Sequence, residues 1–155
     1  MEEFKSLAAE ELYLLFDRDL SRLESEIKTY SAEKNLWITS GDITNSAGNL
    51  TLHLVGNLRH FVGHVLGNSG YVRKRDLEFS DKNIPLETLL EQIEETKREV
   101  KSALKLLTDD QLGSIYPIDV MNKSWTTRQF LMHLSGHLNY HLGQINYHRR
   151  LLDKS

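Results

Sequence analysis

Apolar residues recur three and four positions apart through long stretches of this chain, and only two prolines, Pro85 and Pro117, interrupt them. That spacing places the apolar side chains on one face of an α-helix. Pro85 suits the first turn of a helix, where its missing N–H would be unpaired anyway, and Thr126-x-x-Gln129 resembles a capping box. The sequence therefore predicts four long helices, at about residues 3–30, 47–68, 86–107 and 126–152.

The four predicted helices fit one all-α domain. With 155 residues, of which 39% are hydrophobic, the chain can bury a single core, so we expect residues 1–155 to form one domain. Such helices pack most simply as an antiparallel four-helix bundle. The predicted connections of about fifteen residues are long for a bundle. They indicate either functional surface or crossover connections, and crossovers would change the up-down-up-down topology.

The composition excludes several classes of function. The chain has no cysteine, which rules out disulfides, thiolate metal sites, iron–sulfur clusters and a cysteine nucleophile. Its net charge of −3, without a basic stripe, argues against a nucleic-acid partner. No apolar run approaches the ~20 residues that span a bilayer, and the acidic start differs from a signal peptide. We therefore expect no membrane association and a cytoplasmic location.

Seven histidines stand out, and all lie on the two predicted helices that lack acidic residues. At about 100° of rotation per residue, the histidines form one stripe on each helix. The stripe on the first helix lies within roughly 20° of one direction, and the stripe on the second spans an arc of about 80°. The first stripe consists of His53, His60 and His64, and the second of His133, His137, His141 and His148. Two histidines four residues apart can reach one metal ion, and a third from a neighbouring helix completes a facial set.

Buried histidines also have an ordinary explanation as hydrogen-bonded core residues, and for each one taken singly that explanation is favoured. Taken jointly, several imidazoles on apolar helices would compete for scarce partners, and each unpaired buried polar group costs about 1–3 kcal/mol. A divalent ion resolves that conflict by accepting lone pairs. The set therefore predicts a metal site, with a haem held between two histidines as an alternative.

The surrounding residues narrow the kind of metal site. Neither helix offers the bridging glutamates of a ferritin-like di-iron centre, and no histidine is followed by the glutamate of a zinc-hydrolase motif. Three neutral imidazoles leave a divalent ion its full charge and open positions, which favours a Lewis-acid site that binds water or a thiolate. Imidazole suits zinc, nickel, copper and iron alike, so the ligand type does not name the metal.

Two segments resemble the DinB/YfiT-like metalloenzymes, a family of four-helix bundles with a three-histidine metal site. One is Leu52-His53-Leu54, and the other begins at His137 and is similar to the family pattern His-x-x-Tyr-His-x-Gly-Gln. The resemblance covers essentially the whole chain. It implies that His53, His137 and His141 bind a divalent ion, zinc or nickel first, with iron or manganese as alternatives. It also implies a homodimer.

Several further residues have candidate roles around these ligands. His133 is expected to support the site from outside the ligand set, although the spacing also allows a shifted His133–His137 pair. His60 and His64 are candidate proton carriers that line the pocket, and His148 is expected to be solvated. Gln144 and Asn57 have two equally supported explanations: they orient the imidazoles through hydrogen bonds, or they form ordinary hydrogen bonds between helices.

Two further features, a pair of glycines inside the helices and a basic cluster, each have both an ordinary and a functional explanation. Gly56 and Gly136 lie next to the ligand turns and leave room either for close helix packing, which is favoured, or for a substrate. The basic cluster at residues 71–75 could meet an anionic substrate, but we expect it to be solvated surface.

The resemblance implies a metal-dependent S-transferase that takes a low-molecular-weight thiol and a second small molecule. In that hypothesis the ion lowers the pKa of the thiol and presents its thiolate to an electrophile. A second hypothesis uses water bound to the same ion for hydrolysis. A third is a non-catalytic bundle whose metal only holds the helices together within a homodimer. The fold alone does not choose among them.

Overall fold

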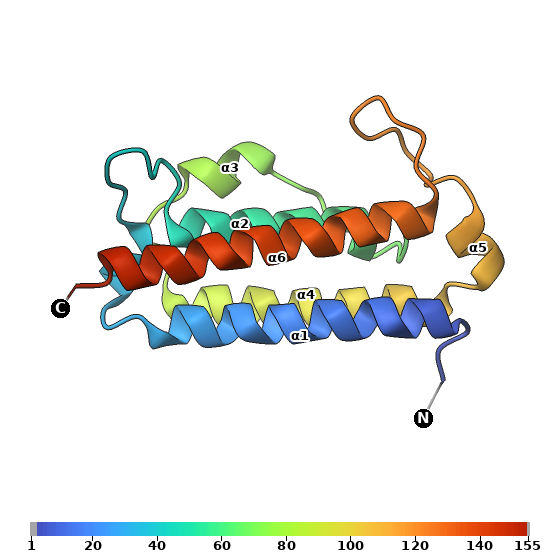
Figure 1. The fold of residues 1–155 in the computed structure, drawn as a ribbon, viewed down its shortest axis with the longest axis horizontal. Helices are drawn as coiled ribbons and strands as arrows, with labels where there is room; N and C mark the ends of the chain where they lie inside the picture. Colours follow the sequence, from blue (N-terminus) through green and yellow to red (C-terminus); the bar gives the residue numbers. More distant parts are fainter. Residues whose placement is uncertain (1–2, 155) are drawn as a thin grey trace.

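A computed structural model describes residues 3–154 and confirms the all-α, four-helix prediction (Figure 1). The long helices are α1 (Leu7–Thr29), α2 (Ala47–Leu58), α4 (Leu86–Leu106) and α6 (Thr127–Leu152). Shorter helices lie in the connections: a 3-10 helix (Glu33–Trp37), a π-helix (Arg59–His64), α3 (Arg75–Ser80) and α5 (Asp109–Gly113). Within the described residues, β structure is limited to three isolated bridges. Residues 1, 2 and 155 of the predicted domain lie outside this description.

Local signals explain where the helices begin. The hydroxyl of Ser6 accepts a hydrogen bond from the backbone N–H of Ala9 at 3.3 Å and so caps α1. Thr126 and Gln129 form the predicted capping box, in which each side chain accepts from the backbone N–H of the other residue. Pro85 directly precedes α4 instead of lying in its first turn, because its ψ of 141° is not helical.

The topology of the bundle differs from the simplest antiparallel arrangement. The helices α1 and α6 run in the same direction, and so do α2 and α4 (Figure 1). Asn139 of α6 donates to Asp19 of α1, and Arg149, further along α6, pairs with Glu26, further along α1. The crossover alternative is therefore the one found: the connection from α2 to α4, residues 65–85, returns along the bundle and carries α3.

The helix predicted at residues 47–68 changes its geometry midway. The α-helix ends at Leu58, and the chain continues as the π-helix to His64. The i→i+5 hydrogen bonds of a π-helix place more residues in each turn than an α-helix does. The prediction that His60 and His64 share the direction of His53 assumed α-helical geometry, which does not extend to those two residues.

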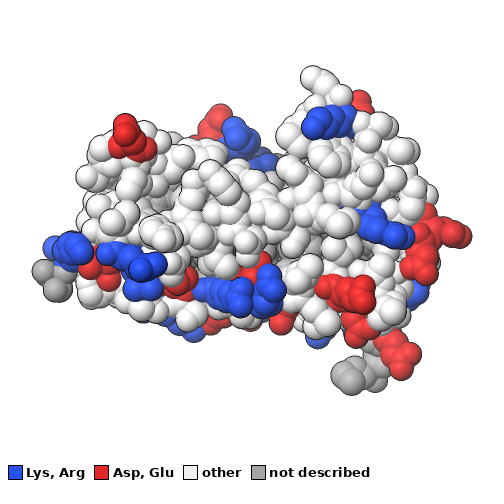
Figure 2. All heavy atoms as spheres, in the orientation of Figure 1, with Lys and Arg blue, Asp and Glu red and all other residues white. Residues whose placement is uncertain are grey.

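The long helices enclose one core, and the charged side chains lie unevenly around it. Phe16, Leu54 and Phe130 are among the fully buried core residues. Figure 2 shows acidic and basic side chains along the α1 edge and at the ends of the bundle, whereas the surface over α6 is largely uncharged. Between Arg128 and Arg149, α6 carries no acidic residue, lysine or arginine. Each helix within residues 3–154 is too short or too polar to cross a membrane.

Candidate metal centre

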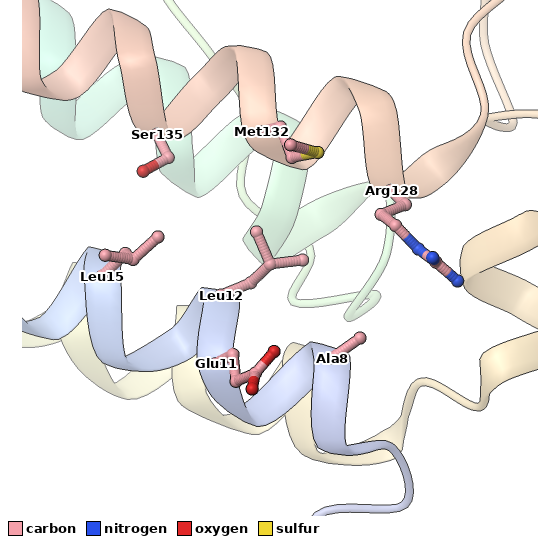
Figure 3. A pocket seen from close by; sticks show the side chains of 7 residues that line it. All are labelled: Ala8, Glu11, Leu12, Leu15, Arg128, Met132 and Ser135. Atoms are coloured by element: carbon pink, nitrogen blue, oxygen red, sulfur yellow. The ribbon is translucent and has the colours of Figure 1, made fainter.

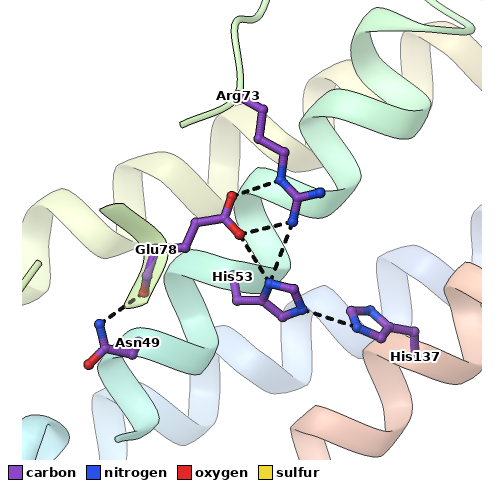
Figure 4. Close-up of polar contacts among 5 residues, drawn as sticks. All are labelled: Asn49, His53, Arg73, Glu78 and His137. Carbon is purple, nitrogen blue, oxygen red and sulfur yellow. Dashed lines mark hydrogen bonds and ion pairs between the residues drawn. The ribbon is translucent and has the colours of Figure 1, made fainter. Parts of the chain in front are cut away.

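Three histidines from two helices converge where α2 faces α6. His53 lies on α2, and His137 and His141 lie one turn apart on α6. Their ring centroids are between 4.5 and 5.3 Å apart, and one nitrogen from each ring lies within 4.8 Å of the others. The Nε2 atoms of His53 and His137 are 3.1 Å apart (Figure 4). The structure thus brings together the three residues that the sequence predicts as ligands.

Two of the three rings have their outer nitrogen bonded to an oxygen acceptor. The Nδ1 of His53 lies 3.0 Å from Oε1 of Glu78, and the Nδ1 of His141 lies 2.7 Å from Oε1 of Gln144. Because an ionised carboxylate or an amide oxygen only accepts, both imidazoles donate from Nδ1. In the neutral ring, this leaves the lone pair on Nε2, which in His53 is the nitrogen that faces His137. Gln144 occupies the orienting position that the sequence predicts for it.

Glu78 is the contact that sequence reasoning missed. It belongs to α3, in a connection expected to be surface, yet its side chain is only 6% exposed. Arg73 donates to it twice, from Nε to Oε2 at 2.8 Å and from Nη2 to Oε1 at 2.9 Å (Figure 4). A signal was present in the sequence, since a histidine buried on a helix without acidic residues needs an acceptor from another element.

Neighbouring residues of α2 fix the position of Glu78. A Cβ added at Gly56 would lie 2.0 Å from Oε2 of Glu78, so a side chain there would displace the carboxylate. The Nδ2 of Asn49 donates to the backbone oxygens of Glu78 and Asp81, at 2.9 and 2.8 Å. Close packing thus explains Gly56, as expected, whereas the Cβ position of Gly136 has no neighbour within 4 Å.

The electrostatics of the cluster favour the neutral form of His137 and His141. Burial, together with the neighbouring His141 and His53, lowers the pKa of His137 to about 4. Burial also lowers the pKa of His141, against the opposing effect of its bond to Gln144. Burial alone would raise the pKa of Glu78, but hydrogen bonds from His53 and Arg73 outweigh it and lower that pKa. Near neutral pH, His137 is therefore a neutral imidazole and Glu78 is an ionised carboxylate.

Two buried side-chain atoms of the described residues have no hydrogen-bond partner, and both lie on the facing helices α2 and α6. They are Nδ1 of His137 and Oδ1 of Asn57, one turn along α2 from His53. The predicted hydrogen bond from Asn57 to an imidazole is therefore not formed through this oxygen. The Nε2 of His53 carries a lone pair, so a neutral His137 has two options. Either its proton is on Nε2 and forms a hydrogen bond to His53, or its Nε2 also carries a lone pair and the two lone pairs face each other across 3.1 Å.

The spacing of two of the donors fits a divalent transition metal, and the third nitrogen lies within 4.8 Å of them. Zinc binds imidazole nitrogen at about 2.0–2.1 Å, so nitrogens at neighbouring coordination positions lie about 2.9–3.4 Å apart. The Nε2 atoms of His53 and His137, 3.1 Å apart, fall within that range. A cation there would accept both lone pairs and would place the proton of His137 on Nδ1, the atom that lacks a partner. The cluster could therefore hold a metal ion through three neutral ligands.

The other histidines of the predicted stripes lie outside this cluster. His133 is exposed and its ring centroid is 5.1 Å from that of Trp125, so the shifted ligand pair is not formed. His60 and His64 have ring centroids 6.4 Å apart in the π-helix, and Nδ1 of His64 accepts a backbone hydrogen bond at 3.2 Å. Burial is the main cause that lowers the pKa of His60. The role of these two residues as proton carriers stays a prediction.

Two sequence predictions about exposure are wrong. His148 is 3% exposed instead of solvated: its Nε2 donates to the backbone oxygen of Ile38, and its Nδ1 accepts from the hydroxyl of Tyr30, both at 2.8 Å. The flanking arginines suggested a surface position, but α6 turns this one residue inward. Arg73 is also withdrawn from solvent, with 13% of its side chain exposed, because it is folded onto Glu78.

A hollow of about 410 Å³ between α1 and α6 lies apart from the histidine cluster (Figure 3). Leu12 and Leu15 of α1 face Met132 of α6 there, and the charged lining residues are Glu11 and Arg128. None of the three clustered histidines lines it. This hollow therefore offers a largely apolar contact surface apart from the histidine cluster.

The fold and the cluster together define a class, that of all-α bundles with three histidines that could hold a metal. Residues 14–155 match the family described as "Protein of unknown function (DUF1572)". Because the match covers most of the chain, the protein belongs to the DUF1572 family. A comparison with curated proteins finds no match. The family assignment therefore names no activity, and the cluster itself has to carry any functional conclusion.

Proposed function

We propose that this protein is a metalloenzyme of the DinB/YfiT-like kind, which binds a divalent ion, zinc or nickel, through His53, His137 and His141. The observation that carries the proposal is the convergence of three imidazole nitrogens within 4.8 Å of one another. Oxygen acceptors hold Nδ1 of His53 and of His141, which leaves the lone pair of each neutral ring on Nε2. The four-helix bundle supports the same assignment.

The proposed reaction is S-transfer from a low-molecular-weight thiol to a small electrophile. The DinB/YfiT-like resemblance supports this reaction class, and the absence of cysteine means that the thiol must come from a second molecule. A divalent ion with only neutral ligands keeps its charge and lowers the pKa of a thiol bound to it. The protein holds three nitrogens in place, lowers the pKa of His137 and His141, and leaves open space at Gly136.

Cobalt(II) with added mercaptoethanol tests whether the metal has a position open to a thiol. We expect a thiolate-to-metal charge-transfer band in the parent protein and in the His133→Ala variant, whose side chain lies outside the cluster. The His141→Ala variant should lack the band. A parent that binds cobalt but shows no band with the thiol would contradict the proposed reaction and favour a metal with a structural role.

Product analysis with an activated aryl halide then tests the reaction itself. The metal-loaded parent should form the thioether only when the thiol is present, and should form little hydroxylated product without it. Equal turnover with and without the thiol would contradict S-transfer and favour hydrolysis by metal-bound water. Metal-free protein provides the background rate.

A further inference from the structure

We propose that Glu78, held by Arg73, is a positioning residue for the metal ligand His53, so that the connection between α2 and α4 is a working part of the metal centre. This inference rests on the proposed metal site. It concerns a residue that contributes no ligand atom and comes from a different element than the three histidines.

The first support is the direction of the contacts. Glu78 Oε1 lies 3.0 Å from Nδ1 of His53, while Nε2 of the same ring lies 3.1 Å from His137 (Figure 4). The carboxylate and the cluster are thus on opposite sides of one imidazole. A carboxylate in that place fixes the ring orientation and tautomer and makes the inner nitrogen a stronger ligand.

The second support is that the carboxylate itself has little freedom. Arg73 donates to both of its oxygens, and the missing side chain of Gly56 provides the space that Oε2 fills. Asn49 holds the backbone of the same residue, because its Nδ2 donates to the oxygen of Glu78 at 2.9 Å. The connection that carries Arg73 therefore fixes the carboxylate of Glu78, and α2 fixes both its carboxylate and its backbone.

The third support is the charge around the cluster. Within residues 3–154, Glu78 is the only carboxylate that is hydrogen-bonded to one of the three histidines. The three imidazoles are neutral donors, so this side chain supplies the negative charge nearest to the cation they would hold. Arg73 shares that charge, which keeps the buried carboxylate paired.

A second arginine–glutamate pair, half-buried, provides a matched control. Arg59 donates from Nη2 to Oε1 of Glu99 at 2.7 Å and joins the π-helix to α4. Gly63 makes space for Glu99 as Gly56 does for Glu78, since a Cβ there would lie 2.5 Å from Oε2 of Glu99. This pair has the same chemistry but no hydrogen bond to a clustered histidine, so its loss should affect stability alone.

The test measures zinc affinity by competition with a chromophoric chelator in the parent, Glu78→Gln, Gly56→Ala and Glu99→Gln proteins. We expect Glu78→Gln to weaken zinc binding about 10-fold to 100-fold. Gly56→Ala displaces the carboxylate without removing it and should weaken binding in the same direction, which keeps the test informative if the first variant does not fold. Glu99→Gln should stay within about twofold of the parent.

The absorption spectrum of the cobalt(II) forms separates positioning from general destabilisation. The ligand-field bands should shift in Glu78→Gln and stay unchanged in Glu99→Gln, because only the former alters a ligand ring. Affinities of both variants within about twofold of the parent, or equal losses in both, would overturn the inference while leaving the metal site intact. A parent that binds neither zinc nor cobalt would overturn the proposed metal site and this inference with it.

Discussion

Two histidines of α6, one in the middle of the helix and one at its end, differ in how their ring nitrogens are hydrogen-bonded. At the end, His148 has both ring nitrogens bonded to the protein, one to Ile38 and the other to Tyr30. In the middle, His137 has a buried Nδ1 with no partner and an Nε2 that faces another imidazole. The fold is therefore able to satisfy a histidine completely where its role is structural. The unpaired Nδ1 of His137 is consistent with the metal site proposed for the middle of the helix.

The largest effect we expect is the stabilisation of the folded protein by a metal bound in the middle of α6. Zinc at a free concentration about a thousand times its Kd should raise the free energy of unfolding by about 4 kcal/mol, since it binds the folded state. Thermal unfolding with zinc and with a chelator measures the difference. A His137→Ala, His141→Ala double variant should show none, and an equal rise in that variant would contradict the assignment of the site.

A substitution of His148, at the end of α6, should change the stability of the protein and leave its zinc affinity unchanged. The His148→Ala substitution leaves the backbone oxygen of Ile38 and the hydroxyl of Tyr30 without their partner. We expect a loss of about 2–3 kcal/mol in the free energy of unfolding, measured by denaturant titration, with zinc affinity unchanged. The exposed His133 serves as control, and its replacement by alanine should cost less than about 0.5 kcal/mol. A large loss of zinc affinity in His148→Ala would break the comparison.

Lowering the pH should destabilise the metal-free protein because His137, in the middle of α6, has a lowered pKa. The pKa of His137 is about 4 in the folded protein and about 6.5 in an unfolded chain. Between these values the unfolded chain takes up a proton that the folded protein does not, so stability falls as the pH is lowered through this window. Denaturant titrations across that range should show a shallower decline in His137→Gln. An identical decline in both proteins would exclude His137 as a cause.

The smallest effect is expected at Gln144. Its Oε1 accepts from Nδ1 of His141 at 2.7 Å, but the side chain is exposed, so water can replace it. We expect Gln144→Ala to weaken zinc binding by up to about tenfold. The Tyr140→Phe control removes only a 3.4 Å contact to Gln144 and should change the affinity less than about twofold. Competition with a chelator measures both variants, and equal affinities would remove Gln144 from the site.

Local spacing predicts the helices and the histidine-bearing face of α6, whereas the choice of three ligands among the seven histidines comes from the family resemblance. The 3.6-residue period and the Thr126 capping box fix where α6 begins and which face His137 and His141 share. Two helices that carry histidines and no acidic residues indicate that their histidine faces meet, and the resemblance then selects His53 on the first of them. The crossover topology does not follow, because the direction of neighbouring helices depends on the length and path of the connections.

The parts of the site that the sequence does not predict are the long-range ones. Glu78 is 25 positions from His53, and its burial depends on the return of the crossover over α2. His148 looks like surface beside Arg149 and Arg150, but its partners come from elements more than a hundred positions away. Polar residues in connections therefore take their roles from packing, which a local pattern does not contain.

The most direct test of the central claim is the metal content of tag-free protein, measured by elemental mass spectrometry. The account predicts close to one zinc or nickel ion per chain after incubation with both metals. It also predicts that the folded His137→Ala, His141→Ala double variant loses the ion. A parent that stays metal-free after exposure to zinc, nickel, iron and manganese would contradict the claim, and the three histidines would then be a polar cluster without a metal.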